Sequence, residues 1–139
     1  MIMQAMLATE VRAHMSSFMD TVVREKPQAI RRNRDIIIAT SHEQMRFFLS
    51  VYTFNFEYEQ DEDGRFAGSM KEIDFIVADG ATLEELRLHL AQQLIDYAQD
   101  YFQDYVRYSH APNTRPHAPY VLRVLLEDNV EAVSRLLKG

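Results

Sequence analysis

The sequence has no cysteine among its 139 residues. Disulfide bonds and zinc sites built on thiolates are therefore excluded. It also has no apolar run long enough to span a membrane, and its first residues lack the layout of a secretory signal peptide. These absences predict a soluble cytoplasmic protein with no membrane partner.

The residues that are present are those of an ordinary globular protein, with 47% hydrophobic and 26% charged side chains. The net charge is −6, but the charges are distributed unevenly. Residues 1–51 hold seven Lys and Arg against five acidic residues, whereas residues 52–139 hold eight against sixteen. A basic front and an acidic back predict two units with different partners. The negative net charge of the whole chain does not exclude nucleic-acid binding by the front, because phosphate binding depends on the local electrostatic field.

Residues 1–51 carry the pattern of a small α+β unit. Residues 2–7 can form an edge strand or begin the helix that follows. From Val11, apolar residues recur at 15, 18 and 22, which places them on one helical face. Thr9 is the predicted N-cap of this helix, and Pro27 is its predicted end.

Two short strands and a helix complete the front unit. Residues 28–32 and 35–40 are predicted strands around the turn Asn33-Arg34, because Ile36 to Ile38 form a short β-branched run. Ser41 and Gln44 form a capping-box pattern, which predicts a helix ending near Val51.

Residues 52–139 predict a second α+β unit. Aromatic and polar residues alternate over 52–59, as in a half-buried strand. The capping box Thr82/Glu85 predicts a helix that runs to about residue 107. The other predicted elements are a turn at 61–64, strands at 65–69 and 72–77 with Asp79-Gly80 as a breaker, a loop at 109–119, a strand at 120–126 and a helix at 130–137.

The front element order, with Val11-Arg12 and Ile30-Arg31-Arg32-Asn33-Arg34-Asp35, resembles the N-terminal domain of Phd/YefM-type antitoxins. The back, with Asp63-Gly64 and Asp79-Gly80-x-Thr82-x-Glu84-Glu85-Leu86, resembles the HicB-like antitoxin fold. The resemblance implies a Phd-like β-α-β-β-α unit over 1–51, followed by a HicB-like β-β-β-α-β-α unit over 52–139. It implies a homodimeric or larger, non-enzymatic antitoxin that neutralises a RelE-type toxin and represses its own operon, with no cofactor.

The basic hairpin is the first candidate site. Arg31, Arg32 and Arg34 stand within four residues and form a compact phosphate-binding group, although arginines are also common at solvated hairpin ends. The resemblance adds Asn33 and Arg12 as DNA contacts. Arg34 replaces the family's glycine, so either Arg34 tolerates about 1–2 kcal/mol of positive-φ strain, or the turn is of another type.

Two sets of apolar side chains are candidate interfaces. A 51-residue unit is too small to bury a full core alone, so a second copy is expected to cover part of it. The expected dimer residues are Phe18, Val22, Met45, Phe48 and Leu49. Tyr101, Tyr105 and Tyr108 share one face at the end of the long helix and form the candidate toxin-binding surface, or else pack against the following proline-rich loop.

Other functions have weaker support in the sequence. The five histidines show no i, i+4 ligand pair, although His110 and His117 share one loop. The carboxylates around residues 61–79 are compatible with a metal-dependent hydrolase. They stand mainly at turns, however, where aspartate is favoured because it forms local hydrogen bonds. A further alternative is a homo-oligomeric interaction module that does not bind DNA.

Overall fold

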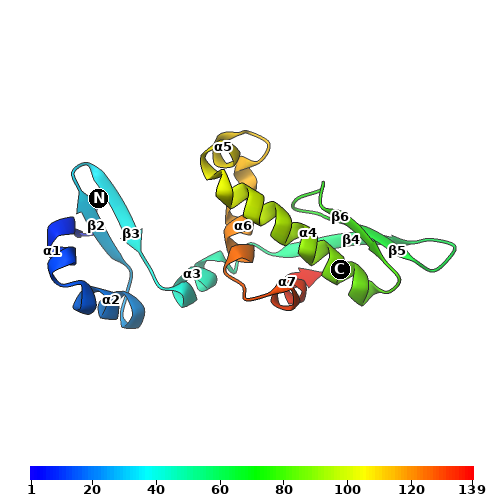
Figure 1. Cartoon of the computed structure of the whole chain (residues 1–139), viewed down its shortest axis with the longest axis horizontal. Helices are drawn as coiled ribbons and strands as arrows, with labels where there is room; N and C mark the ends of the chain where they lie inside the picture. The colour runs from blue at the N-terminus through cyan, green and yellow to red at the C-terminus, as the bar shows by residue number, and fades with distance from the viewer. The chain divides into compact units, whose positions relative to one another are not determined.

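The computed structural model describes residues 1–139, which divide into two compact units, Met1–Phe48 (unit 1) and Leu49–Gly139 (unit 2). Each unit has its own sheet (Figure 1), and each has its own hydrophobic core. The sequence predicted the boundary after residue 51. No helix of the structure is both long and apolar enough to cross a membrane.

Unit 1 is built on a three-stranded sheet of order β1-β2-β3, in which β1 and β2 are parallel and β2 and β3 antiparallel. Two helices connect the parallel strands. Its elements are β1 (Ala5–Leu7), α1 (Ala8–Ala13), α2 (Met15–Arg24), β2 (Gln28–Arg32), β3 (Asp35–Ala39) and α3 (His42–Leu49), whose last residue belongs to unit 2.

The single helix predicted before Pro27 is wrong in two respects. It is divided at His14, where φ is −129° and ψ is 41°, into α1 and α2. Ser17 Oγ donates a hydrogen bond to the His14 carbonyl oxygen at 3.1 Å, the kind of local bond with which serine competes against a regular helix. Thr9 is not the cap, because β1 continues directly into α1 and Leu7 occupies the N-cap position without a side-chain bond.

Unit 2 has a four-stranded sheet of order β6-β5-β4-β7. The long helix α4 packs on this sheet, and α6 and α7 pack against α4 (Figure 1). Thr82 Oγ1 caps α4 by accepting from the Glu85 N–H at 3.0 Å, as predicted. The elements are β4 (Phe54–Gln60), β5 (Phe66–Met70), β6 (Val77–Gly80), α4 (Leu83–Gln103), α5 (Tyr105–His110), the 3₁₀ turn η1 (Arg115–His117), α6 (Ala118–Leu125), α7 (Val130–Leu136) and β7 (Leu137–Lys138).

The third strand of unit 2 begins later than predicted. Residues 72–76 form a turn that buries Ile73 and Ile76, and the Ile76 N–H donates to the Ile73 carbonyl oxygen at 3.0 Å. Asp79-Gly80, predicted to lie after the strand as its breaker, forms the last two residues of β6. A Cβ on Gly80 would lie 2.6 Å from Leu86 N, so glycine is required by the close approach of α4.

Three further predictions for unit 2 are wrong. Residues 118–125 form helix α6 instead of a strand, with Val121 and Val124 buried on one helical face and Pro119 in the first turn, where its missing N–H is not needed. The long helix ends at Gln103, and α5 begins after Asp104. The expected loop at 109–119 contains the end of α5 and η1, and β7 was not predicted at all.

Candidate nucleic-acid interface and partner surfaces

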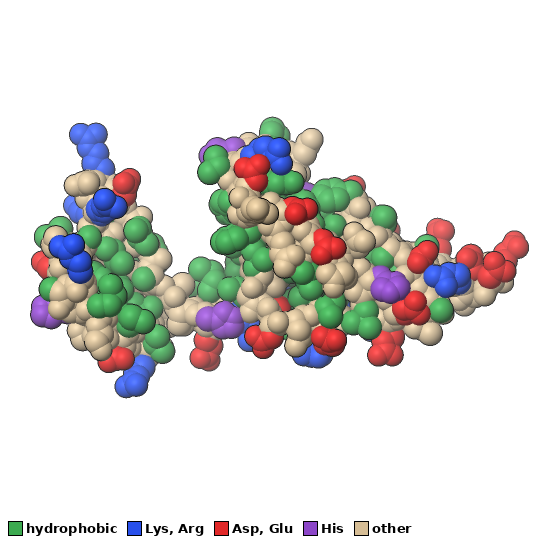
Figure 2. Space-filling view, viewed as in Figure 1, with side chains coloured by type: hydrophobic (Ala, Val, Ile, Leu, Met, Phe, Trp, Pro, Cys, Tyr) green, Lys and Arg blue, Asp and Glu red, His purple; other side chains and the backbone are tan.

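The arginine-rich hairpin is formed as the sequence predicts. β2 and β3 pair antiparallel with Arg32 opposite Asp35, so Asn33 and Arg34 form a two-residue turn. Figure 2 shows Lys and Arg side chains projecting beyond this hairpin. The tip is therefore a prominent cationic point on unit 1.

The conformation of the turn answers the question of strain at Arg34. Asn33 has a φ of 55° and is the only non-glycine residue in the chain with a positive φ, so Arg34 carries no left-handed strain. Asparagine tolerates left-handed angles better than most residues, which explains how the family's glycine can be absent at the second position.

The arginines surround the hairpin tip on both sides. Successive residues of a strand face opposite sides of the sheet, so Arg31 and Arg32 project to opposite faces. Leu7 pairs with Arg31, which places the start of α1, and thus the helix that carries Arg12, at the same end of the sheet. All four arginines are exposed, and none of them forms an ion pair.

The predicted dimer residues are partly used within the chain. Phe18 and Val22 form the small core of unit 1 together with Val11, and Leu49 is buried as well. Phe48 is 49% exposed, and Met45 is half-buried. Phe18 and Val22 still border a groove between α2 and residues 39–43.

A larger apolar surface on unit 1 was not predicted. The face of its sheet that holds Met6 and Ile30 packs on the core, so the opposite face carries Leu7, Ile36 and Ile38. These three side chains are 51%, 40% and 51% exposed. The run of three isoleucines could have predicted this surface. In a strand with only one buried face, apolar residues are needed at every second position, so three in succession place an apolar side chain on the other face as well.

The tyrosine face of α4 is mainly core, and the prediction of an exposed tyrosine surface is corrected. Tyr101 is 0% exposed and donates a hydrogen bond from its hydroxyl to the Thr114 carbonyl oxygen at 2.9 Å. Tyr108 stacks on Tyr101 with ring centroids 5.1 Å apart, while Tyr105 is 37% exposed. The tyrosines thus pack against the proline-rich segment, which was the alternative to a toxin-binding surface in the sequence analysis.

The same cluster holds a perturbed tyrosine–histidine pair. Tyr97 Oη lies 2.7 Å from His117 Nδ1, and Phe75 packs edge-on to Tyr97 at 4.9 Å between centroids. Burial, followed by the neighbouring Tyr101 and Tyr108 hydroxyls, raises the pKa of Tyr97 to about 12. Burial lowers the pKa of His117, although Asp74 acts in the opposite direction. Both side chains are held neutral near pH 7.

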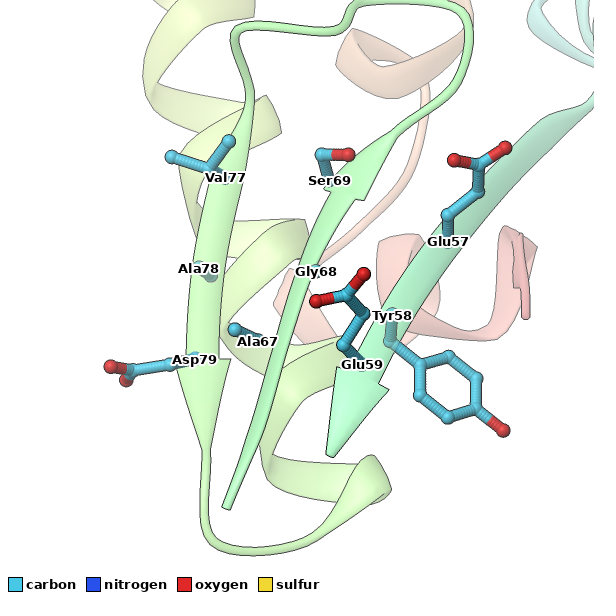
Figure 3. Close-up of a pocket in the computed structure, with 9 residues that line it drawn as sticks. All are labelled: Glu57, Tyr58, Glu59, Ala67, Gly68, Ser69, Val77, Ala78 and Asp79. Carbon is cyan, nitrogen blue, oxygen red and sulfur yellow. The ribbon is translucent and has the colours of Figure 1, made fainter. Parts of the chain in front are cut away.

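The outer face of the unit 2 sheet forms an open trough of about 740 Å³. Two cross-strand rows line it, Glu57–Ser69–Val77 and Glu59–Ala67–Asp79 (Figure 3). The intervening row faces α4, because a Cβ on Gly68 would meet Leu86 Cδ2 at 3.1 Å. Lys71 pairs with Glu57 at 3.7 Å and Arg65 with Asp79 at 3.2 Å, so Glu59 alone among the three carboxylates lacks a cation.

The remaining carboxylates and histidines do not converge. No group of three or more His, Cys, Asp or Glu side chains has the spacing of a metal site. His110 and His117 do not meet in the proline-rich loop, because His110 Nδ1 contacts the Val106 carbonyl oxygen at 2.7 Å and His117 contacts Tyr97.

Two comparisons connect these features with a known class of protein. A PHD-like family model, described as antitoxin of toxin–antitoxin, RelE/RelB, TA system, matches residues 1–139. The chain therefore belongs to this family of antitoxins. No curated protein matches the sequence.

A solved structure is similar over nearly the whole chain. It is the crystal structure of an antitoxin part of a proposed toxin/antitoxin system from Syntrophomonas wolfei subsp. wolfei. The two sequences are 38% identical, the match covers 97% of this chain and 96% of the other, and the TM-score is 0.89. The similarity thus includes both units and supports the family assignment.

Proposed function

We propose that this antitoxin is a homodimer that neutralises a RelE-type toxin and represses its own operon. In this proposal, unit 1 binds operator DNA through the hairpin tip, and unit 2 binds the toxin. The protein acts by binding alone: the dimer occludes the promoter, and the bound antitoxin prevents the toxin from acting. The unpaired arginines at the hairpin tip, in a chain of the antitoxin family, are the observation that carries the proposal.

The charge distribution supports DNA binding by unit 1. Arg31, Arg32 and Arg34 stand on a two-residue hairpin and carry no ion pair, so their charges are not neutralised within the chain. Arginine binds phosphate through two parallel hydrogen bonds, and a projecting hairpin reaches a duplex ahead of the rest of its unit. Arg12 lies in α1, which begins at the same end of the sheet, and is the fourth cation of the proposed interface.

The exposed apolar surface supports dimerisation by unit 1. Its core contains three buried apolar residues besides Ala29, whereas Leu7, Ile36 and Ile38 remain exposed on one face of the sheet. β3 is also an edge strand with free backbone groups. Arg31 stands between Leu7 and Ile36 on this face, so in the proposed dimer the second copy covers the part around Ile38 and the β3 edge and leaves Arg31 at the rim. Such a dimer has two cationic hairpins, which matches the two half-sites of a palindromic operator.

The test is operator binding measured across salt concentrations. The triple variant R31A/R32A/R34A should bind its promoter DNA more weakly, and the slope of log affinity against log salt should flatten by about 0.9 for each phosphate that the variant no longer neutralises. The control variant R115A/R135A/K138A removes the same charge from exposed positions of unit 2 and should leave the slope unchanged. Equal slopes for wild type and R31A/R32A/R34A would leave a homo-oligomeric module without DNA binding as the better account.

A further inference from the structure

We infer that Arg32 and Asp35 together read one G·C base pair in each half-site of the operator, from the major groove. In this arrangement the Arg32 guanidinium donates hydrogen bonds to guanine, and the Asp35 carboxylate accepts one from the amino group of the paired cytosine. The neighbouring Arg31 and Arg34 bind phosphates. The inference rests on the proposed function, because it names the sequence feature that the hairpin recognises.

The acidic residue at the hairpin tip is the first observation. Asp35 is the first residue of β3, is exposed, and makes neither an ion pair nor a side-chain hydrogen bond within the chain. Its charge repels phosphate, so it lowers the affinity of the tip for any DNA. An ionised carboxylate only accepts hydrogen bonds. On duplex DNA, phosphate and deoxyribose oxygens are acceptors as well, so the amino groups of the bases are the donors that Asp35 can use.

The register of the hairpin places a donor beside this acceptor. Asp35 stands directly opposite Arg32 in the β2–β3 ladder. Directly opposite residues of antiparallel strands point to the same face of the sheet, with Cβ atoms about 4.5–5.5 Å apart. Both side chains are exposed, and they form no ion pair with each other. A guanidinium and a carboxylate are therefore presented side by side to a single ligand.

A G·C base pair has the matching groups. In the major groove, guanine presents the acceptors N7 and O6, and the paired cytosine presents its N4 amino group as a donor. Arginine donates to both guanine acceptors at once, and a carboxylate accepts from cytosine N4. An A·T pair fits the same two side chains poorly, because the adenine amino group lies next to the N7 acceptor, and thymine presents O4 and a methyl group.

The dimensions of the hairpin select the major groove. A two-stranded ribbon fits into this groove, which is about 12 Å wide, but not into the minor groove, which is about 6 Å wide. Arg31 points to the other face of the ribbon, where its neighbours Leu7 and Ile36 are apolar. Arg31 forms no ion pair, so its charge suits the phosphates at the opposite wall of the groove.

The experiment begins with the selection of bound duplexes from a randomised DNA library by the full-length protein. Wild type should select a G·C pair at one position of each half-site. R32A and D35A should both lose the preference at that position and keep the preferences elsewhere, because the two side chains contact the same base pair. R31A should keep this preference and should instead flatten the slope of log affinity against log salt by about 0.9 for the lost phosphate.

Binding of wild-type protein to altered duplexes then tests the groove, independently of the folding of any variant. Replacing the selected G·C pair by A·T changes the major-groove pattern and should weaken binding about tenfold or more. Replacing its guanine by inosine removes the minor-groove amino group and leaves the major groove as it was, so binding should be unchanged. Weaker binding of the inosine duplex places the recognition in the minor groove and overturns the inference.

A further comparison separates base reading from charge alone. D35A should bind unrelated DNA more tightly than wild type, since a repulsive charge is gone, yet should bind the G·C and A·T duplexes alike. D20A removes the same charge from an exposed position of α2, away from the hairpin turn (Figure 1), and should keep the preference for G·C. If D35A keeps that preference and strengthens binding to all duplexes by one factor, Asp35 contacts no base and the inference is wrong.

Failure of this inference is distinguishable from failure of the proposed function. Wild-type protein that binds every duplex alike, with a salt slope that R31A/R32A/R34A flattens, contradicts the reading of a base pair but leaves DNA binding by the hairpin in place. Wild-type protein that binds no duplex DNA contradicts the proposed function itself.

Discussion

At the scale of single residues, Asn33 is the position where the backbone most restricts the choice of side chain. Its φ of 55° lies in the left-handed region, which residues other than glycine, asparagine and aspartate adopt at a cost of about 1–2 kcal/mol. We expect Asn33→Ala to destabilise the β2–β3 hairpin by about 1 kcal/mol and Asn33→Gly to leave it unchanged. Hydrogen exchange of the β2 and β3 amides measures this difference. Equal protection in N33A and wild type would contradict the assignment of strain.

The same substitutions separate geometry from contact at the DNA interface. Asn33→Gly keeps the turn but removes the side-chain amide, whereas the neighbouring arginines are untouched. If operator affinity falls in N33G with normal hydrogen exchange, Asn33 contacts DNA directly. If affinity is kept, its role is to shape the turn that presents Arg32 and Arg34.

His117 predicts a pH dependence of stability. Burial lowers its pKa below the ordinary value of 6.5, so the unfolded chain binds more protons than the folded chain once pH falls through that value. The stability linked to neutral His117 is therefore complete above pH 6.5 and is lost progressively as pH falls towards the lowered pKa. Urea midpoints measured from pH 8 down to about pH 5 should decline more steeply in wild type than in His117→Gln.

The control for this effect is His110→Gln, which leaves the contact between His117 and Tyr97 in place. We expect H110Q to keep the decline of the wild type. H117Q should have a lower urea midpoint at pH 8, since the substitution removes the ring that packs on Phe75 and Tyr97, but a flatter profile. If the urea midpoints of H117Q and wild type decline in parallel as the pH falls, groups other than His117 cause the loss of stability at low pH.

At the scale of elements, the contact between β6 and α4 depends on Gly80. A Cβ there would lie 2.6 Å from Leu86 N, and backbone cannot yield as a flexible side chain can. We expect Gly80→Ala to lower the free energy of unfolding of unit 2 by about 1–3 kcal/mol, as overpacking does in other cores. Chemical unfolding followed by circular dichroism provides the value. Ala81→Ser, at the exposed next residue, is the matched control and should be neutral.

The elements that sequence predicted well are those whose signals are local. The Thr82/Glu85 cap, the Ser41/Gln44 cap and the Asn33-Arg34 turn all appear in the structure, because each depends on bonds within a few residues. α6 was predicted as a strand because its β-branched residues have high strand propensity. The competing signals were Pro119 in the first helical turn and the three-residue spacing of Val121 and Val124.

Features that depend on distant parts of the chain could not be predicted. Asp79-Gly80 resembles a turn locally, and only the approach of Leu86 explains the glycine within β6. Tyr101 lies on the buried face of α4, whereas Tyr105 and Tyr108 lie in α5. The sequence could show neither the break at Asp104 nor that Tyr101 bonds to Thr114 in the proline-rich segment.

At the scale of the whole molecule, the two units differ in how much apolar surface each buries. Unit 2 buries a continuous core that extends from Phe54 through Tyr101 to Val133, whereas the core of unit 1 is centred on Val11, Phe18 and Val22. Units as small as unit 1 usually need oligomerisation for stability. The dimer proposed above therefore stabilises unit 1 as well as pairing its hairpins.

The dimer predicts that stability and assembly change together on dilution. Ile36→Lys and Ile38→Lys place a charge on the exposed sheet face of unit 1 and should produce monomers, since burying an unpaired charge in an interface is unfavourable. Sedimentation at micromolar concentration measures the change in mass. Val77→Lys puts the same charge at an exposed position of unit 2 and should leave the mass at that of the wild type. Wild-type protein that sediments as a monomer would remove the dimer from the proposal.

The different cores also predict different behaviour of the separated units. Residues 49–139 should fold alone and unfold cooperatively, because the buried residues of unit 2 contact one another through α4 and its sheet. This fragment should also retain toxin binding, since unit 2 is the proposed toxin-binding unit. Residues 1–48 should lose structure on dilution, and neither fragment should match the operator affinity of the full chain. Toxin captured by residues 1–48 instead of by residues 49–139 would reverse the roles proposed for the two units.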